Sequence, residues 1–173
     1  MKEIKLVVVG LTGSGKTTLV KHASQIPVVE TDERSLRDIG KPTTTTALDF
    51  GAVDMGDVRV RLFGTPGQER FSYMWDDLLQ GADGFIFLID GSDPESLEAA
   101  REMLRTYREK TSIPFIVGIT HSDVPRSMTP EEVAKYLELP EWAVRGVVAT
   151  DRESALSLVG YFVELLKKGG RYG

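Results

Sequence analysis

Residues 10–18, "GLTGSGKTT", constrain this 173-residue chain more than any other part of its sequence. They contain the pattern G-x-x-x-x-G-K-[ST]. The apolar run "EIKLVVV" precedes it and predicts a buried strand, and a helix is predicted from Gly15 to about Gln25. Glycines let the backbone turn several N–H groups towards one point, and a helix N-terminus adds partial positive charge there. The stretch therefore predicts a phosphate-binding loop between a strand and a helix.

Two side chains of this loop have defined expected roles. We expect Lys16 to reach the β- and γ-phosphates of a nucleotide and Thr17 to bind Mg²⁺. The loop alone indicates a nucleoside triphosphate, without choosing between ATP and GTP or between hydrolysis and kinase transfer. The nucleotide-binding residues predicted here are Gly10, Thr12, Gly13, Ser14, Gly15, Lys16, Thr17 and Thr18.

The order of strand and helix patterns predicts the fold class. "GFIFLID", "PFIVGIT" and "RGVVAT" are strand candidates that alternate with amphipathic helices, which is typical of a mostly parallel sheet. "TALDFGAV" and "VRVRLF" flank a tight turn at Met55-Gly56 and predict an antiparallel hairpin. The polar residues 30–45 predict a long loop, and no repeat or linker divides the chain. We expect one α/β domain over residues 1–173: a six-stranded, mostly parallel sheet with an antiparallel hairpin at its edge and helices on both faces.

Composition excludes several function classes. The net charge of −5 gives no support to nucleic-acid binding. The absence of cysteine excludes disulfides, thiolate metal sites and cysteine-linked lipid anchors. The longest apolar runs are too short to cross a bilayer. We therefore expect a cytoplasmic protein without a direct membrane anchor.

The segment "GITHSDV" follows a predicted strand and resembles the base-reading motif [N/T]-K-x-D of Ras-like small GTPases. Thr120 and Asp123 match this motif, while His121 stands where the family has lysine. One carboxylate can accept hydrogen bonds from both N1–H and the exocyclic amine of guanine, whereas adenine offers no such pair of donors. We therefore expect Asp123 to select GTP.

The end of the last predicted strand, "VVATDRES", resembles the family's second base-reading loop. There the resemblance implies that a backbone N–H meets guanine O6, and Ala149 and Thr150 occupy the matching positions. Asp151 could also cap the last helix.

The segment "TTTTALDF" resembles the first switch of Rab-type members, T-x-x-x-D-F, with Asp49-Phe50 closing the pattern. The resemblance implies that Thr45 binds Mg²⁺ through its hydroxyl and the γ-phosphate through its N–H. The run of threonines leaves Thr44 and Thr46 open as alternatives.

The segment "GTPGQERF" resembles the second switch, D-x-x-G-Q-E. The resemblance implies that Gly67 donates its N–H to the γ-phosphate and that Gln68 orients the attacking water, so Gln68, Lys16 and Gly67 are the expected catalytic residues. Gly64 stands where the family has the aspartate that holds a water on Mg²⁺. From this substitution we expect weaker Mg²⁺ binding or faster nucleotide loss.

Together these motifs predict a guanine-nucleotide switch that uses GTP, GDP and Mg²⁺ and hydrolyses GTP slowly, since Thr12 stands where Ras-type loops often carry glycine. Two alternatives remain: a GTP-regulated binding module with negligible hydrolysis, and a P-loop kinase. Arg34 and Arg37 are open candidates for an arginine finger. The "GTPGQERF" form is most similar to a prokaryotic branch that includes the gliding-motility polarity GTPases and conservon-type GTP-binding proteins. That resemblance implies a regulatory partner of the Roadblock/LC7 type, acting as an activator of hydrolysis or as an exchange factor.

Overall fold

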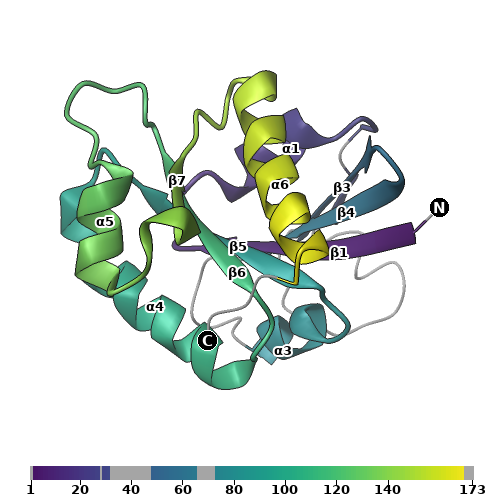
Figure 1. Ribbon diagram of the computed structural model, residues 1–173, viewed down its shortest axis with the longest axis horizontal. Helices are drawn as coiled ribbons and strands as arrows, with labels where there is room; N and C mark the ends of the chain where they lie inside the picture. Colours follow the sequence, from purple (N-terminus) through teal and green to yellow (C-terminus); the bar gives the residue numbers. More distant parts are fainter. Residues whose placement is uncertain (1, 28, 32–47, 66–72, 170–173) are drawn as a thin grey trace.

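The computed structural model describes residues 2–27, 29–31, 48–65 and 73–169, and these residues form one seven-stranded sheet with helices on both faces (Figure 1). The strand order is β2-β3-β4-β1-β5-β6-β7. The strands are β1 (Lys2–Gly10), β2 (Val29–Thr31), β3 (Leu48–Met55), β4 (Val58–Gly64), β5 (Gly84–Asp90), β6 (Phe115–Thr120) and β7 (Val144–Gly146). The helices are α1 (Lys16–Ala23), α3 (Tyr73–Leu79), α4 (Leu97–Lys110), α5 (Pro130–Leu137) and α6 (Arg152–Lys167), with short 3-10 turns η2 (Pro94–Ser96) and η3 (Glu141–Ala143).

The predicted α/β fold is confirmed. All six predicted strands are present, and the short strand β2 adds a seventh at the edge by pairing antiparallel with β3. β3 and β4 form the predicted antiparallel hairpin, while the pairs β1–β4, β1–β5, β5–β6 and β6–β7 are parallel. No helix within the described ranges is long and apolar enough to cross a membrane.

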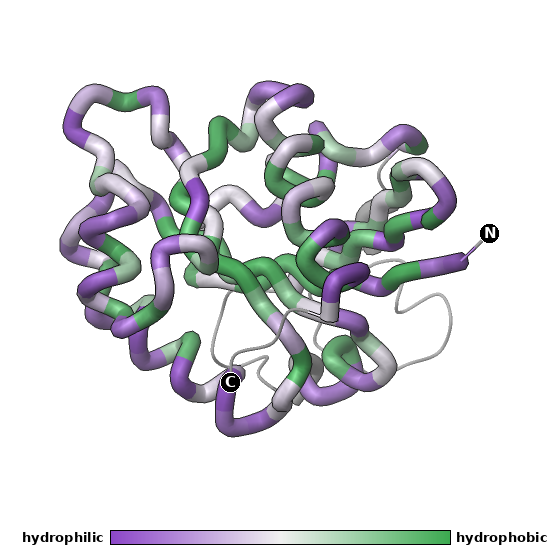
Figure 2. The backbone as a smooth tube through the Cα atoms, viewed as in Figure 1, coloured by the Kyte–Doolittle hydropathy of each residue, from purple (hydrophilic) through white to green (hydrophobic). Residues whose placement is uncertain are grey.

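Alternating side chains of the strands divide the interior into two cores. Leu6 and Val8 of β1 point into one core, which α1 and α6 cover. Val7 and Val9 point into the other, which α4 and α5 cover. Figure 1 shows α1 and α6 on one side of the sheet and α4 on the other, and Figure 2 shows hydrophobic residues concentrated along the central strands. Burial on both faces explains why the central strands read as continuous apolar runs.

The last predicted strand is placed differently in the structure. We expected it over "RGVVAT", whereas β7 is Val144–Gly146 and residues from Val147 onward leave the ladder. Val147 and Ala149 are nevertheless buried in the core under α1 and α6. These residues are apolar because their loop packs into the core. An apolar run in the sequence does not distinguish such a loop from a buried strand.

The strand order reverses at β1. From β1 the chain passes through α1 to β3 and β4 on one side, and then crosses to β5 on the other side of β1. Ligands in open α/β sheets bind where the strand order reverses in this way. The predicted phosphate loop follows β1 directly and lies at this point.

Candidate nucleotide-binding site

Residues 11–15 form a tight loop between β1 and α1, as the sequence predicted. Gly15 has φ of +105°, a left-handed conformation that suits glycine, and it precedes the first residue of α1. At Gly10 an added Cβ would lie 2.6 Å from the carbonyl oxygen of Leu88 and 2.7 Å from Oγ of Ser14. The first glycine of the pattern thus lets the loop lie against β5.

Lys16 folds back over this loop. Its Nζ donates hydrogen bonds to the carbonyl oxygens of Gly10 at 2.9 Å and Leu11 at 2.8 Å, and the residue is only 8% exposed. Burial lowers the pKa of Lys16 to about 8, although the Asp49 carboxylate acts in the opposite direction. The loop therefore holds an ammonium group that lacks a full counter-charge, and nucleotide phosphates would supply one.

Ser14 adds a second group suited to a polar ligand. The residue is 3% exposed, and its hydroxyl has no hydrogen-bond partner among the described residues. Buried hydroxyls normally have such a partner. The residues of this loop thus fit a phosphate group.

Thr17, the predicted Mg²⁺ ligand, contacts a carboxylate. Its hydroxyl donates a hydrogen bond of 2.6 Å to Oδ2 of Asp49, a residue of β3 that is 6% exposed. In the sequence, Asp49 only closes the first-switch pattern together with Phe50. The structure brings it to the phosphate loop, although it lies far from Thr17 in the sequence.

Gly64, the position that lacks the family aspartate, lies directly opposite Asp49 in the β3–β4 ladder. An added Cβ at Gly64 would be 3.2 Å from Oδ2 and 3.3 Å from Cβ of Asp49. The Asp49 carboxylate of β3 thus lies next to Gly64 of β4, which has no side chain.

Thr120 joins the predicted base-reading segment to the phosphate loop. Its hydroxyl lies 2.9 Å from the carbonyl oxygen of Ser14 and 3.2 Å from that of Ile89, and the residue is 1% exposed. A Cβ added to Gly15 would meet Cγ2 of Thr120 at 3.3 Å and Cβ of Ala149 at 3.8 Å. The structure therefore brings together the phosphate loop and both predicted base-reading segments.

His121 pairs with an acidic residue that the sequence analysis did not single out. It adopts a left-handed conformation with φ of 59°, and its Nδ1 lies 2.8 Å from Oδ1 of Asp90. Burial raises the pKa of Asp90, but hydrogen bonds from Ser92 and the nearby His121 outweigh it and keep that pKa below its usual value. An ionised Asp90 accepts a hydrogen bond and so favours the His121 tautomer that carries a proton on Nδ1.

Asp123 and Thr150 are exposed in the loops after β6 and β7. Asp123 lies in a turn closed by the hydrogen bond from the Val124 N–H to the His121 carbonyl oxygen. Asp151 caps α6, since its side chain accepts from the N–H of Glu153 at 3.1 Å. Thr12, Gly13 and Thr18 lie at the phosphate loop and the first turn of α1.

Several predicted site residues lie outside the described residues. They are Thr45 with its alternatives Thr44 and Thr46, Gly67, Gln68, Arg34 and Arg37.

Sequence reasoning missed two acidic residues, Asp49 and Asp90. The hairpin could have pointed to Asp49, because its turn fixes the register that pairs Asp49 with Gly64. The turn was predicted at Met55-Gly56 but lies one residue later, at Gly56-Asp57, because Met55 is the last residue of β3 and pairs with Val58. Asp90 ends β5 at the edge where the loops gather, which is a position typical of site residues.

Comparisons with known proteins agree with this geometry. The ADP-ribosylation factor family matches residues 1–162. Human ADP-ribosylation factor-like protein 15 is 27% identical over 177 residues, covering 96% of this chain and 81% of that protein. Protein MJ1339 of Methanocaldococcus jannaschii is 31% identical over 147 residues, covering 83% of this chain and 85% of that protein.

Two solved structures share the fold. The Arl6 BBS3 small GTPase of Trypanosoma brucei, with the bound nucleotide analogue GppNp, superposes with a TM-score of 0.74 at 16% identity and covers 96% of this chain and 99% of its own. The G domain of the T. maritima FeoB iron transporter gives a TM-score of 0.70 at 20% identity and covers 94% and 98%. Taken with the family match over residues 1–162, these findings show that the chain belongs to the ADP-ribosylation factor family, small GTPases that bind GTP and GDP with Mg²⁺ and hydrolyse GTP.

Proposed function

We propose that residues 1–173 form a single G domain in which Lys16 and Thr17 bind the phosphates and Mg²⁺ and Asp123 reads the guanine base. The observation that carries this proposal is the Thr120 hydroxyl, 2.9 Å from the Ser14 carbonyl oxygen, because it holds the base-reading segment against the phosphate loop. One nucleotide can then contact both segments. Ala149, which lies near Gly15, provides the second base contact through its loop together with Thr150.

The two switch segments complete the site in this proposal. Thr45 binds Mg²⁺ and the γ-phosphate, Gly67 donates its N–H to the γ-phosphate, and Gln68 orients the attacking water. Hydrolysis removes the γ-phosphate contacts and releases both segments, which changes the surface offered to a partner. Thr12 is exposed within the loop and slows hydrolysis by crowding the approach to the γ-phosphate.

The "GTPGQERF" form supports membership of the prokaryotic branch that includes the gliding-motility polarity and conservon-type GTPases, and a partner of the Roadblock/LC7 type. The 31% identity to an archaeal protein is compatible with a prokaryotic setting. We also propose a cytoplasmic location, supported by the absence of cysteine from the sequence.

Base selection can be tested by exchanging Asp123 for asparagine. Asp123→Asn removes an acceptor that guanine needs but supplies an N–H donor that fits the carbonyl of xanthine. Hydrogen bonds to charged groups contribute about 1.5–3 kcal/mol, so we expect GDP affinity to fall about 10- to 100-fold and xanthosine diphosphate to become the preferred ligand.

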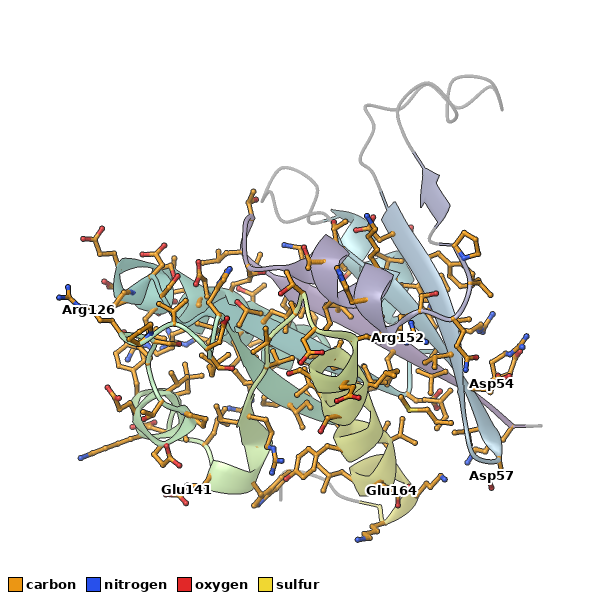
Figure 3. All side chains as sticks on the ribbon, turned by 90° about the horizontal axis from the view of Figure 1, so that it is seen from above. Asp54, Asp57, Arg126, Glu141, Arg152 and Glu164 are labelled. Carbon is orange, nitrogen blue, oxygen red and sulfur yellow. The ribbon has the colours of Figure 1, made fainter. Side chains whose placement is uncertain are left out.

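Fluorescence titration with GDP, ADP and xanthosine diphosphate measures this preference. Glu141→Gln is the matched control, because Glu141 is exposed in η3, which precedes β7 (Figure 3). Ala149 and the proposed base contact follow the other end of this strand. Wild-type protein that binds ADP as tightly as GDP would contradict the proposal. Single-turnover GTP hydrolysis, compared with Gln68→Leu, tests the catalytic assignment separately.

A further inference from the structure

Asp49 is a buried carboxylate whose surroundings indicate a function beyond folding. It is 6% exposed at the start of β3 and accepts its short hydrogen bond from the Thr17 hydroxyl. Carboxylates are rarely buried unless they are paired or bind a metal. The Thr17 hydroxyl satisfies one lone pair but is neutral. The Lys16 ammonium is close enough to interact with the Asp49 charge, but it donates its hydrogen bonds to the carbonyl oxygens of Gly10 and Leu11. Asp49 therefore keeps lone pairs that a cation can use.

We propose that Asp49 is the metal carboxylate of this GTPase, acting from β3 in place of the acidic residue that β4 lacks at Gly64. The inference rests on the proposed function, because Mg²⁺ would be held together with the phosphates of the bound nucleotide.

The hydrogen bond to Thr17 gives Asp49 a way to act on the metal. Thr17 is the position where the phosphate-loop pattern places a hydroxyl ligand to Mg²⁺. A hydroxyl that donates its proton to Asp49, 2.6 Å away, keeps its lone pairs for the metal. Partners of metal ligands orient them in this way, and their loss typically lowers metal affinity 10- to 100-fold. The negative charge also attracts the cation and the waters that Mg²⁺ retains.

The register explains why the carboxylate can come from either strand. Asp49 and Gly64 are directly paired, so side chains at these positions share the same space. A Cβ at Gly64 would lie 3.2 Å from Oδ2 of Asp49, and a second carboxylate there would also repel the first. Asp49 and Gly64 thus form a matched pair that provides one carboxylate.

A purely structural role predicts a different outcome. Asp49 does not cap α1, because its hydrogen bond to this helix comes from the Thr17 hydroxyl and not from a backbone N–H. If Asp49 served only to hold Thr17 in place, an asparagine would do the same, since its amide oxygen accepts a hydrogen bond. Asp49→Asn therefore separates charge from position.

The first test is the Mg²⁺ dependence of nucleotide release. A fluorescent GDP analogue is bound to the protein, and its release rate is measured over a range of free Mg²⁺ concentrations. We expect Asp49→Asn to need about 10- to 100-fold more Mg²⁺ for half-maximal retention. The control is Asp54→Asn, which removes a partly exposed carboxylate of the same strand that pairs with Arg59 near the hairpin turn (Figure 3). We expect no change for this control.

The second test is an exchange across the ladder. Asp49→Gly alone should lose the Mg²⁺ dependence of the wild type, and Gly64→Asp alone should be destabilised by crowding. The double variant Asp49→Gly/Gly64→Asp should regain wild-type Mg²⁺ dependence to within about threefold.

Unchanged Mg²⁺ dependence in Asp49→Asn, or a double variant no better than Asp49→Gly, overturns the inference. Both results are distinct from failure of the proposed function, in which the wild-type protein does not bind guanine nucleotide at all.

Discussion

Lys16 is a charged side chain that the fold keeps almost wholly from water. Two backbone carbonyls accept from its ammonium group, yet burial still lowers the pKa of Lys16 to about 8. The folded protein therefore stabilises the charged form less well than water does. This cost is carried by a residue whose expected partner is a phosphate group, as is common at functional sites.

A pH dependence of stability follows from this burial. Burial lowers the pKa of Lys16 in the folded protein from its ordinary value of 10.5 to about 8. Between these values the unfolded chain binds more protons, so this residue makes the free energy of unfolding rise with pH. Lys16→Met should remove a rise on the order of 2 kcal/mol between pH 7.5 and 9.5.

Denaturant unfolding of nucleotide-free protein at these two pH values measures the effect. The difference between wild type and variant isolates Lys16 from the other titrating groups. An equal rise in both proteins would show that Lys16 keeps an ordinary pKa.

The sequence predicts site residues that belong to a contiguous motif, but it does not predict those that reach the site through strand pairing. Lys16 and Thr17 belong to a contiguous pattern, and the structure places them at the predicted loop. Asp49 gains its contact with Thr17 only through strand pairing. A contact between residues that are distant in sequence leaves no local pattern. The sequence alone therefore indicates a weakened metal site at Gly64, and only the pairing of β3 with β4 shows that Asp49 lies beside it.

At the scale of elements, α1 is fixed to β3 by contacts at its C-terminal end. The Ser24 hydroxyl oxygen accepts from the Ala52 N–H at 3.0 Å, and the Gln25 N–H donates to the Ala52 carbonyl oxygen at 2.7 Å. The helix can approach this closely because Gly51 has no side chain: an added Cβ would lie 2.7 Å from Cβ of Ser24 and 3.2 Å from Cγ1 of Val20. This docking sets the separation between α1 and the strand that carries Asp49.

Replacing Gly51 tests this docking. Gly51→Ala forces α1 away from β3, and overpacking of this kind costs about 1–3 kcal/mol of the free energy of unfolding. Gly160→Ala in α6 is the matched control, because its added Cβ would meet only Sδ of Met55, at 3.9 Å. The control should gain about 0.5–1 kcal/mol from its better helix propensity. Urea unfolding measures the change in the free energy of unfolding for each variant, which should fall for Gly51→Ala and rise for Gly160→Ala. A rise for Gly51→Ala would contradict the close packing of α1 on β3.

Elements with strong periodicity were predicted well, and their boundaries less so. The capping box at Thr129 and Glu132 is a local sequence signal, and it sets the start of α5 at Pro130. The last strand was wrong in position because Val147 and Ala149 are buried without a ladder. The strand β2 was not predicted, since three residues at an edge carry no period of their own.

At the scale of the whole molecule, the site gathers segments that are distant in sequence. The phosphate loop follows β1, Asp49 lies near the start of β3, and the proposed base-reading loops follow β6 and β7. α1 is also joined to α6, where Arg152 donates hydrogen bonds to the carbonyl oxygens of His22 and Ser24 (Figure 3). A ligand that contacts all these segments should therefore stabilise the fold as a unit.

The size of this stabilisation can be predicted for GDP with Mg²⁺. At a free ligand concentration 100 times Kd, binding adds about 2.7 kcal/mol to the free energy of unfolding. For a chain of this length each kcal/mol raises Tm by about 2–4 °C, so we expect a rise of about 5–10 °C. ADP at the same concentration should produce no such rise, because adenine lacks the pair of donors that the proposed contact with Asp123 requires. Chelation of Mg²⁺ by EDTA should remove part of the GDP effect in the wild type and less in Asp49→Asn, where the metal contributes less to nucleotide binding. Differential scanning calorimetry measures the GDP-induced rise in Tm for the wild type and for Asp49→Asn, each with and without EDTA. If EDTA reduced this rise equally in the two proteins, the metal would be held without Asp49.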